Sequence, residues 1–297
     1  LFHKTLTHII MPKYTSIMKL KSNKSKSNSY IFSTQQTIVM GILNITNDSF
    51  YDGGKYQKEE QIILQCQNML DEGVSIIDIG AQSTRPGAIQ ITSEEELKKL
   101  LPVIRLLKKT FKNITISIDT FWANTALECI NAGANIINDI SAGEIDKNMF
   151  PTISELNIPY IMMHMQGNPQ NMQKQPSYKN PTLEIIMYFE NKIEQLNKLD
   201  FNKIIIDPGF GFGKTIKHNY QILNNLNKFK ILNRPILVGT SRKSMIYKLL
   251  ENTPAEALNG TSIVNTIALQ NGANILRVHD IKEAMECIKI TTFAKKM

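Results

Sequence analysis

Eight short apolar runs recur along this chain, and each is followed by a longer segment with apolar residues at helical spacing. The runs are rich in Ile and Val and almost continuous, which is typical of parallel strands buried on both faces. The predicted strands are residues 38–43, 75–79, 115–118, 135–140, 160–163, 203–206, 235–238 and 274–278. The predicted helices are residues 58–72, 93–110, 122–132, 147–156, 181–199, 217–229, 254–271 and 282–296.

This alternation predicts an α/β fold, a (β/α)8 TIM barrel that forms a single domain over residues 37–297. A doubly wound open sheet is the alternative. The barrel is preferred because no predicted strand ends in the GxGxxG turn with which such sheets bind dinucleotides. Ser93 followed by Glu96 predicts a capping box at the start of the second helix.

Residues 1–36 differ from the rest of the chain in charge. They contain six lysines and no acidic residue, so they account for six of the eight net positive charges. Their polar, low-complexity composition predicts a disordered basic extension. Because the excess charge lies in this extension and not on a folded face, we expect no nucleic-acid partner, with an RNA-binding or targeting arm as the alternative.

Apolar run lengths and cysteine positions bear on the compartment. No apolar run approaches the roughly 20 residues of a membrane span, so we expect no membrane partner. Cys66, Cys129 and Cys287 lie far apart in predicted helices. This pattern is typical of reduced, partly buried thiols in a cytoplasmic protein. No histidine motif accompanies them, which argues against a catalytic thiol.

Polar side chains stand at the C-terminal end of every predicted strand. In a (β/α)8 barrel these ends meet at one rim, which is where such folds place their active sites. A lone Asp or Asn at such a position is more often a helix cap, but eight in register indicate a binding site. These positions are Asn44; Asp78 with the loop 82–87; Asp119 and Thr120; Asn138 and Asp139; Met163, His164 and Gln166; residues 207–214; residues 239–244; and Arg277, His279 and Asp280.

One group of these side chains suits a flat, nitrogen-rich ring. Asp119, Asn138 and Asp207 combine acceptors and donors, and a carboxylate takes two N–H donors from a guanidine-like edge. Met163 and Phe212 would supply apolar faces for the ring.

A second group is cationic and suits an anion such as phosphate or carboxylate. Its members are Arg85, Lys243, Arg277 and His279. Ser244 lies where a loop enters a helix, whose N-terminal amides would add donors for an anion. Asn44 offers the hard oxygen that Mg²⁺ prefers beside a diphosphate. No His/Cys cluster has zinc spacing, and His164 is equally well explained as a satisfied histidine near the core.

In chain order, these motifs resemble those of the dihydropteroate synthase family, the folate-pathway enzymes that sulfonamides inhibit. The segments read NITNDSFYDGG, QSTRPGA, SIDT, NDISAG, MHMQGNPQNMQ, DPGFGFGK, GTSRKS and RVHD, and they span residues 37–291. The resemblance implies a (β/α)8 barrel and a transferase that joins 6-hydroxymethyl-7,8-dihydropterin diphosphate to p-aminobenzoate. The products would be 7,8-dihydropteroate and pyrophosphate. It further implies Mg²⁺ as cofactor and a homodimer.

The resemblance also assigns roles to residues. It implies that the pterin is bound by Asp119, Asn138, Met163, Asp207, Phe212, Gly239 and Lys243. It implies that the diphosphate is bound by Asn44, Thr84, Arg85, Arg277 and His279, with Mg²⁺ near Asn44. It implies that p-aminobenzoate is bordered by Phe50, Thr84, Pro86, Lys243 and Ser244.

The implied mechanism is a dissociative substitution at the pterin CH₂ group. Arg85, Arg277, His279 and Mg²⁺ would stabilise the negative charge on the departing pyrophosphate. Asp119 would stabilise the cationic pterin, helped by Asp52 when its loop closes. The catalytic residues would therefore be Asp119, Lys243, Arg277 and Asp52, and the loops 46–54 and 83–87 would close over the anions.

Two positions depart from the family's usual pattern. Gln82 stands where Glu is common, and Asn47 stands where Pro is common. The two changes remove a charge from one loop and a fixed φ from the other, which bears on loop closure and rate but not on the reaction class. The rival interpretations are a methyltetrahydrofolate:corrinoid methyltransferase, which shares the pterin contacts but has no use for a diphosphate site, and a catalytically inactive barrel retained as a structural subunit.

Overall fold

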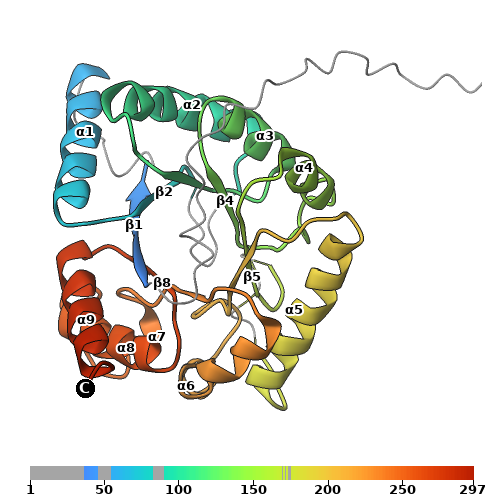
Figure 1. The fold of residues 1–297 in the computed structure, drawn as a ribbon, viewed down its shortest axis with the longest axis vertical. Coiled ribbons are helices and arrows are strands. Elements are labelled where there is room, and N and C mark those ends of the chain that lie inside the picture. The colour runs from blue at the N-terminus through green and yellow to red at the C-terminus, as the bar shows by residue number, and fades with distance from the viewer. Residues whose placement is uncertain (1–36, 46–54, 83–89, 169, 171, 173–174) are drawn as a thin grey trace, which may run out of the picture.

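Figure 1 shows the computed structural model of the chain, in which helices surround a ring of strands. The structure describes residues 37–45, 55–82, 90–168, 170, 172 and 175–297. The predicted extension over residues 1–36 lies outside the described residues, so its disorder and its separation from the barrel stay predictions.

Eight parallel strands form one sheet in the order β6-β5-β4-β3-β2-β1-β8-β7. The strands are β1 (Ile38–Asn44), β2 (Ile76–Gly80), β3 (Ile116–Asp119), β4 (Ile136–Asp139), β5 (Tyr160–Met163), β6 (Ile204–Asp207), β7 (Leu237–Val238) and β8 (Ile275–Val278). The two end strands meet at a bridge between Ile206 and Ile236, where the Ile206 N–H donates to the Pro235 carbonyl at 3.0 Å. The sheet therefore closes on itself, which confirms the predicted TIM barrel and excludes the open sheet.

Helices cover the outside of the barrel (Figure 1). They are α1 (Lys55–Asp71), α2 (Ser93–Thr110), α3 (Ala123–Asn131), α4 (Met149–Leu156), α5 (Pro181–Asn197), α6 (Ile216–Asn224), α7 (Ser244–Tyr247), α8 (Leu258–Gln270) and α9 (Ile281–Ala294), with a 3₁₀ helix at Leu226–Leu232. The predicted helix over residues 217–229 is divided, because the Asn225 side chain donates to the Gln221 carbonyl at 2.8 Å and competes with the helical pattern. The single turn α7 was not predicted.

The capping box of α2 lies one residue earlier than predicted. Thr92, not Ser93, is the N-cap; its Oγ1 accepts from the Glu95 N–H at 3.2 Å, and a Glu95 carboxylate oxygen accepts from the Thr92 N–H at 2.9 Å. Glu96 instead turns toward the barrel and is fully buried. There it accepts from Gln82 Nε2 at 3.0 Å and bonds Thr120 Oγ1 at 2.6 Å.

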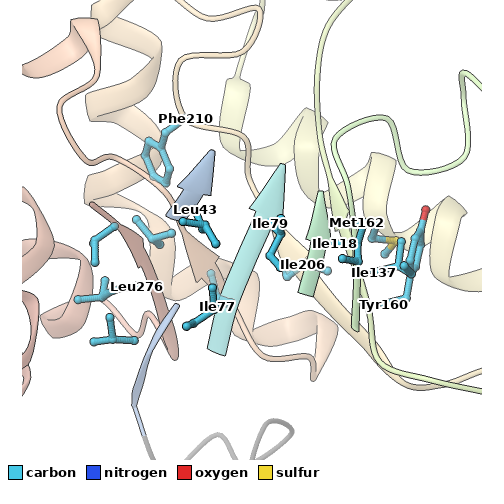
Figure 2. Packing of buried hydrophobic residues seen from close by; sticks show 14 of the residues in the cluster. Leu43, Ile77, Ile79, Ile118, Ile137, Tyr160, Met162, Ile206, Phe210 and Leu276 are labelled. Atoms are coloured by element: carbon cyan, nitrogen blue, oxygen red, sulfur yellow. The ribbon is translucent and has the colours of Figure 1, made fainter. Parts of the chain in front are cut away.

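The larger part of the apolar core lies between the barrel and its helices. Figure 2 shows labelled members from seven different strands and from the loop after β6: Leu43, Ile77, Ile79, Ile118, Ile137, Tyr160, Met162, Ile206, Phe210 and Leu276. Each fully buried side chain of this size contributes about 1.5–3 kcal/mol to folding. This layer is built by alternate residues of the strands, because successive strand side chains point to opposite faces.

The other residues of each strand point into the barrel. Its interior contains an apolar layer of Ile38, Met40, Ile76, Ile136, Ile161, Ile205, Leu237 and Ile275. All eight are at most 5% exposed, so the barrel is a packed core and not a channel. This apolar layer lies directly beneath the polar rim and forms the floor of the rim.

The three cysteines are free and buried, more completely than the predicted partial burial. Burial raises the pKa of the Cys66 thiol to about 12, so this thiol is protonated and unreactive at neutral pH. In the described part of the chain, no helix has both the length and the apolarity to cross a membrane.

Candidate active site

The predicted rim residues follow directly from the barrel interior. Two positions beyond the apolar layer, the same strands present Asp78, Asn138, Met163, Asp207, Gly239 and Arg277. Because side chains repeat with a period of two along a strand, these positions point to the same side as the residues beneath them. The rim is therefore the next layer of the barrel, built from different residue types.

Arg277 on β8 joins the rim across the barrel. Its Nε donates to Asp78 Oδ2 at 2.7 Å, and its Nη2 donates to Asp119 Oδ2 at 2.8 Å. Asn138 Nδ2 also donates to Asp78 Oδ2, at 3.0 Å. Although burial opposes its charge, the two carboxylates raise the pKa of Arg277 above its ordinary value. Residues from β2, β3, β4 and β8 thus form one charged network.

Asp78 belongs to this network but was not predicted to bind a substrate. It is fully buried, and its Oδ1 has no hydrogen-bond partner among the described residues. Burial of this carboxylate is compensated because Arg277 and Asn138 both donate to its other oxygen. Its position, two residues after the interior Ile76, was the available signal.

Two further carboxylates are held at unusual pKa values. Burial raises the pKa of Asp119 to about 7; Arg277 opposes this shift and Asp78 adds to it. Burial also raises the pKa of Asp207, against the opposing charge of Lys243. Asp207 Oδ1 accepts from the Gly209 N–H at 2.8 Å, which fixes its orientation. Titratable groups perturbed in this way are a common mark of active sites.

Lys243 contacts the loop that follows β6. Its Nζ donates to the Phe210 carbonyl at 2.6 Å and lies 4.8 Å from the centroid of the Phe212 ring. Burial lowers the pKa of Lys243 to about 8, and Asp207 limits the shift. The amine therefore changes charge within reach of physiological pH.

The residues predicted to line a slot for a flat ring lie near one another. Met163 is buried in a small apolar cluster against which Phe212 packs. A Cβ built on Gly239 would lie 3.7 Å from Arg277 Cβ and 3.9 Å from Lys243 Nζ. Glycine here keeps the space between the two cations open. The structure thus brings the residues of the predicted pterin set together on one rim.

His164 has a structural contact, as the alternative interpretation held. It is buried, and its Nδ1 lies 3.0 Å from Lys214 Nζ. Lys214 also donates to the Phe212 carbonyl at 2.9 Å, and burial lowers the pKa of Lys214 to about 7. Gly209, at φ +73°, approaches so closely that a Cβ would lie 2.0 Å from the His164 carbonyl oxygen. These contacts hold the loop after β6 against β5, and the sequence did not single out Lys214 for this role.

The structure describes only some of the predicted anion-binding residues. His279 lies exposed at the rim, where Ser241 Oγ contacts its Nδ1 at 3.0 Å and accepts from its backbone N–H at 3.2 Å. Partial burial beside Arg277 lowers the pKa of His279, so it is neutral near pH 7 and the expectation of a cationic histidine is wrong for the ligand-free protein. When the Ser241 hydroxyl donates to Nδ1, the neutral ring carries its hydrogen on Nε2, which is then a donor.

Several predicted residues lie outside the described residues. They are Phe50 and Asp52 in the first loop, and Thr84, Arg85 and Pro86 in the second. Ser244 is described and begins α7, but this helix is a single turn, so the dipole expected to assist an anion is small. The wall formed by the two loops therefore stays a prediction.

Asn44, the predicted Mg²⁺ ligand, ends β1 at an exposed position. A Cβ built on Gly80 would lie 3.5 Å from Asn44 Oδ1 and 3.6 Å from Asp119 Cβ, so glycine keeps a space between the amide and the carboxylate. No group of three metal-binding side chains occurs in the part of the chain that the structure describes. Mg²⁺ often takes one or two protein oxygens together with substrate phosphates, and the Asn44 amide oxygen is a donor of this kind.

Comparison with known proteins agrees with this geometry. The family described as pterin binding enzyme matches residues 40–279. Dihydropteroate synthase of Escherichia coli (strain K12) is 41% identical over 254 residues, which cover 85% of this chain and 89% of that protein.

Solved structures give the same result. Dihydropteroate synthase of Yersinia pestis with a sulfonamide drug complex has a TM-score of 0.83 and 39% identity, covering 89% of this chain and 96% of that one. The enzyme of Xanthomonas albilineans in complex with 7,8-dihydropteroate has a TM-score of 0.79 and 30% identity, with the same coverage. The chain therefore belongs to the dihydropteroate synthase family of pterin-binding enzymes, which are transferases of folate synthesis.

Proposed function

We propose that this chain condenses 6-hydroxymethyl-7,8-dihydropterin diphosphate with p-aminobenzoate and releases pyrophosphate. One observation carries the proposal: a layer of carboxylates and amides meets a layer of cations on a single barrel rim, joined by Arg277. The 7,8-dihydropteroate bound to the Xanthomonas albilineans relative is the product of this reaction. The corrinoid methyltransferase alternative explains the pterin contacts but gives the cationic side no ligand.

The pterin would bind in the slot between Met163 and Phe212. Its amino-amide edge presents several N–H donors, and the ionised Asp119 and Asp207 are acceptors. Asn138 supplies both a donor and an acceptor. Each of these groups is buried or half-buried, so a ring without matching donors would leave polar atoms unpaired, which is a strong source of discrimination.

The diphosphate would lie toward the exposed side of the rim. Arg277, His279 Nε2 and Asn44 face it, together with Thr84 and Arg85 from the second loop. p-Aminobenzoate would bind beside Lys243 and Ser244, bordered by Phe50, Thr84 and Pro86. Asn44 and oxygens of the substrate would hold Mg²⁺, which would neutralise charge on the leaving group.

The reaction is a dissociative substitution. The bond between the pterin CH₂ carbon and the diphosphate oxygen breaks, and its electron pair leaves with pyrophosphate. Arg277 and Arg85 stabilise the leaving group. Asp119 stabilises the positive charge that remains on the pterin, with Asp52 assisting from the first loop. The amine nitrogen of p-aminobenzoate then bonds to the CH₂ carbon and loses a proton to water, since the neutral aniline needs no strong base.

We further propose a cytoplasmic homodimer without nucleic-acid partners. The three free cysteines suit a reducing compartment. Helices α8 and α9 lie side by side (Figure 1) and carry the exposed apolar residues Ile263, Ile290 and Phe293. Apolar side chains that gather on such a face are typical of a surface covered by another subunit.

The function is tested by measuring pyrophosphate release from the full chain with pterin diphosphate and Mg²⁺, with and without p-aminobenzoate. We expect release that depends on p-aminobenzoate and yields dihydropteroate. Hydrolysis without this dependence would refute the acceptor site. The absence of both pyrophosphate release and pterin binding would refute the proposal and favour the inactive barrel.

A further inference from the structure

Arg242 has an unusual backbone for its residue type. Its φ is +55°, in the left-handed region that non-glycine residues seldom adopt. It stands between Ser241, which contacts His279, and Lys243, which contacts the loop after β6. A strained residue between two groups of the site persists only where surrounding contacts hold it.

The side chain of Arg242 makes such contacts with two other segments. Its Nε and Nη2 donate to the two oxygens of Asp280, each at 2.9 Å, in a bidentate pair. Its Nη1 donates to the carbonyls of Pro254 at 3.0 Å and Ala255 at 2.7 Å. The Arg242 N–H is also bound, by Thr261 Oγ1 at 3.1 Å. One residue thus ties the loop after β7 to the turn after β8 and to the stretch before α8.

The contacts form two consecutive links between the same loops. Ser241 bonds both Nδ1 and the backbone N–H of His279, and the next residue, Arg242, bonds Asp280, which follows His279. Two adjacent links fix both the distance and the register of the loops. They also set the orientation of the His279 ring and of the chain leading into Lys243.

From this geometry we infer that Arg242 and Asp280 form a clamp that positions His279 for the diphosphate and Lys243 for the pterin and p-aminobenzoate. The inference rests on the proposed function. Arg242 and Asp280 are positioning residues, because neither has to touch the substrate. Their side chains are 27% and 18% exposed, and a bidentate pair in this half-buried setting fixes the relative orientation of the two groups as well as adding energy.

The opposite charges of Arg242 and Asp280 also compensate each other next to His279. Arg277, Asp280, Arg242 and Lys243 are the charged groups that act on His279. Removing Arg242 leaves the Asp280 carboxylate uncompensated, which favours protonated His279 and raises its pKa. Neutralising Asp280 leaves the cations and lowers the pKa. These opposite shifts would show that both charges act on His279, while the KM values report how well its ring is placed.

The test compares R242M, R242K, D280N and the double variant R242M/D280N with wild type. We expect R242M and D280N each to raise the KM for pterin diphosphate about tenfold with a smaller change in kcat, since misplaced groups weaken binding of the anion. The double variant should be no worse than either single one, because both remove the same clamp. R242K keeps the charge but loses the fork, so its effect should be intermediate.

The control is K198M, which removes an exposed ion pair with Glu194 on α5, far from the rim in sequence. Thermal unfolding identifies any variant that fails to fold. If R242M does not fold, the KM values of R242K and D280N test the clamp. The His279 pKa, followed by NMR in the ligand-free protein, should rise in R242M and fall in D280N. Wild-type KM values together with an unchanged His279 pKa would overturn the clamp. If wild type itself released no pyrophosphate, the proposed function would fail, while the NMR titration would still test the clamp.

Discussion

Two layers of the same barrel interior differ completely in chemistry although they are two residues apart on each strand. The lower layer is apolar and closed, and Ile136 is typical of it. The upper layer holds Asp78, Asn138, Asp207 and Arg277. In the lower layer, buried side chains stabilise the fold. In the upper layer, Arg277 and Asn138 donate to Asp78, and Asp207 accepts from the Gly209 N–H. Stability and recognition are therefore separated along each strand by a single side-chain repeat.

The lower layer should govern stability. Ile136→Ala removes a fully buried side chain from the packed floor and should lower the free energy of unfolding by about 2–5 kcal/mol. Urea unfolding measures this change, and KM values taken where the variant is folded should stay near wild type. Leu64→Ala, at an exposed position of α1, is the control and should change stability by less than about 0.5 kcal/mol. A large KM change in Ile136→Ala would contradict the claim that the lower layer determines stability and the upper layer determines recognition.

The upper layer should govern activity. Arg277→Met removes the guanidinium that joins the carboxylates and faces the leaving group, so kcat/KM should fall about 10²–10³-fold, or about 2.7–4 kcal/mol. Steady-state kinetics measure the loss. Arg105→Met, at an exposed position of α2, should leave kcat/KM unchanged. Near-normal activity in Arg277→Met would remove Arg277 from the catalytic residues.

The pH profile should sharpen the comparison, because Asp119 and Lys243 at the rim titrate near neutrality. Below its pKa of about 7, Asp119 is protonated and loses its acceptor, so kcat/KM should fall as the pH drops. Above its pKa of about 8, Lys243 loses its charge, so kcat/KM should fall as the pH rises. Each decline should approach tenfold per pH unit.

Variants assign the two limbs of this profile. Asp119→Asn should lose most turnover, and its residual activity should lack the acid limb. Lys243→Arg keeps its charge at high pH and should lose the alkaline limb. An acid limb that persists in Asp119→Asn would assign it to another group.

The smallest effect should come from an ion pair outside both layers. Lys198→Met on α5 removes an exposed contact of 2.8 Å with Glu194 and should leave stability almost unchanged, because solvent screens such a pair. Chemical denaturation measures the difference. A cost comparable to that of Ile136→Ala would contradict the view that stability resides in the barrel core.

The sequence predicted the architecture and most of the rim because both follow from periodicity. Apolar runs locate the strands, and the polar residues that end them must meet at one edge of a closed barrel. The partners within the rim could not be predicted in the same way. Arg277 and Asp78 are 199 positions apart, and no local pattern states that they bond.

The incorrect details have local physical causes. Thr92 with Glu95 and Ser93 with Glu96 both satisfy the capping pattern, and only burial of Glu96 against Thr120 selects the first. Asn225 divides a predicted helix through a bond of its own side chain. The neutral state of His279 depends on its position beside Arg277, which sequence spacing does not reveal.

The most direct test of the account is a crystal structure of the full chain with 6-hydroxymethyl-7,8-dihydropterin diphosphate and Mg²⁺. We predict that the ring lies between Met163 and Phe212, with its N–H donors on Asp119 and Asp207, and that the diphosphate contacts Arg277 and His279. A ring bound away from the upper layer, or a diphosphate out of reach of Arg277, would contradict the account.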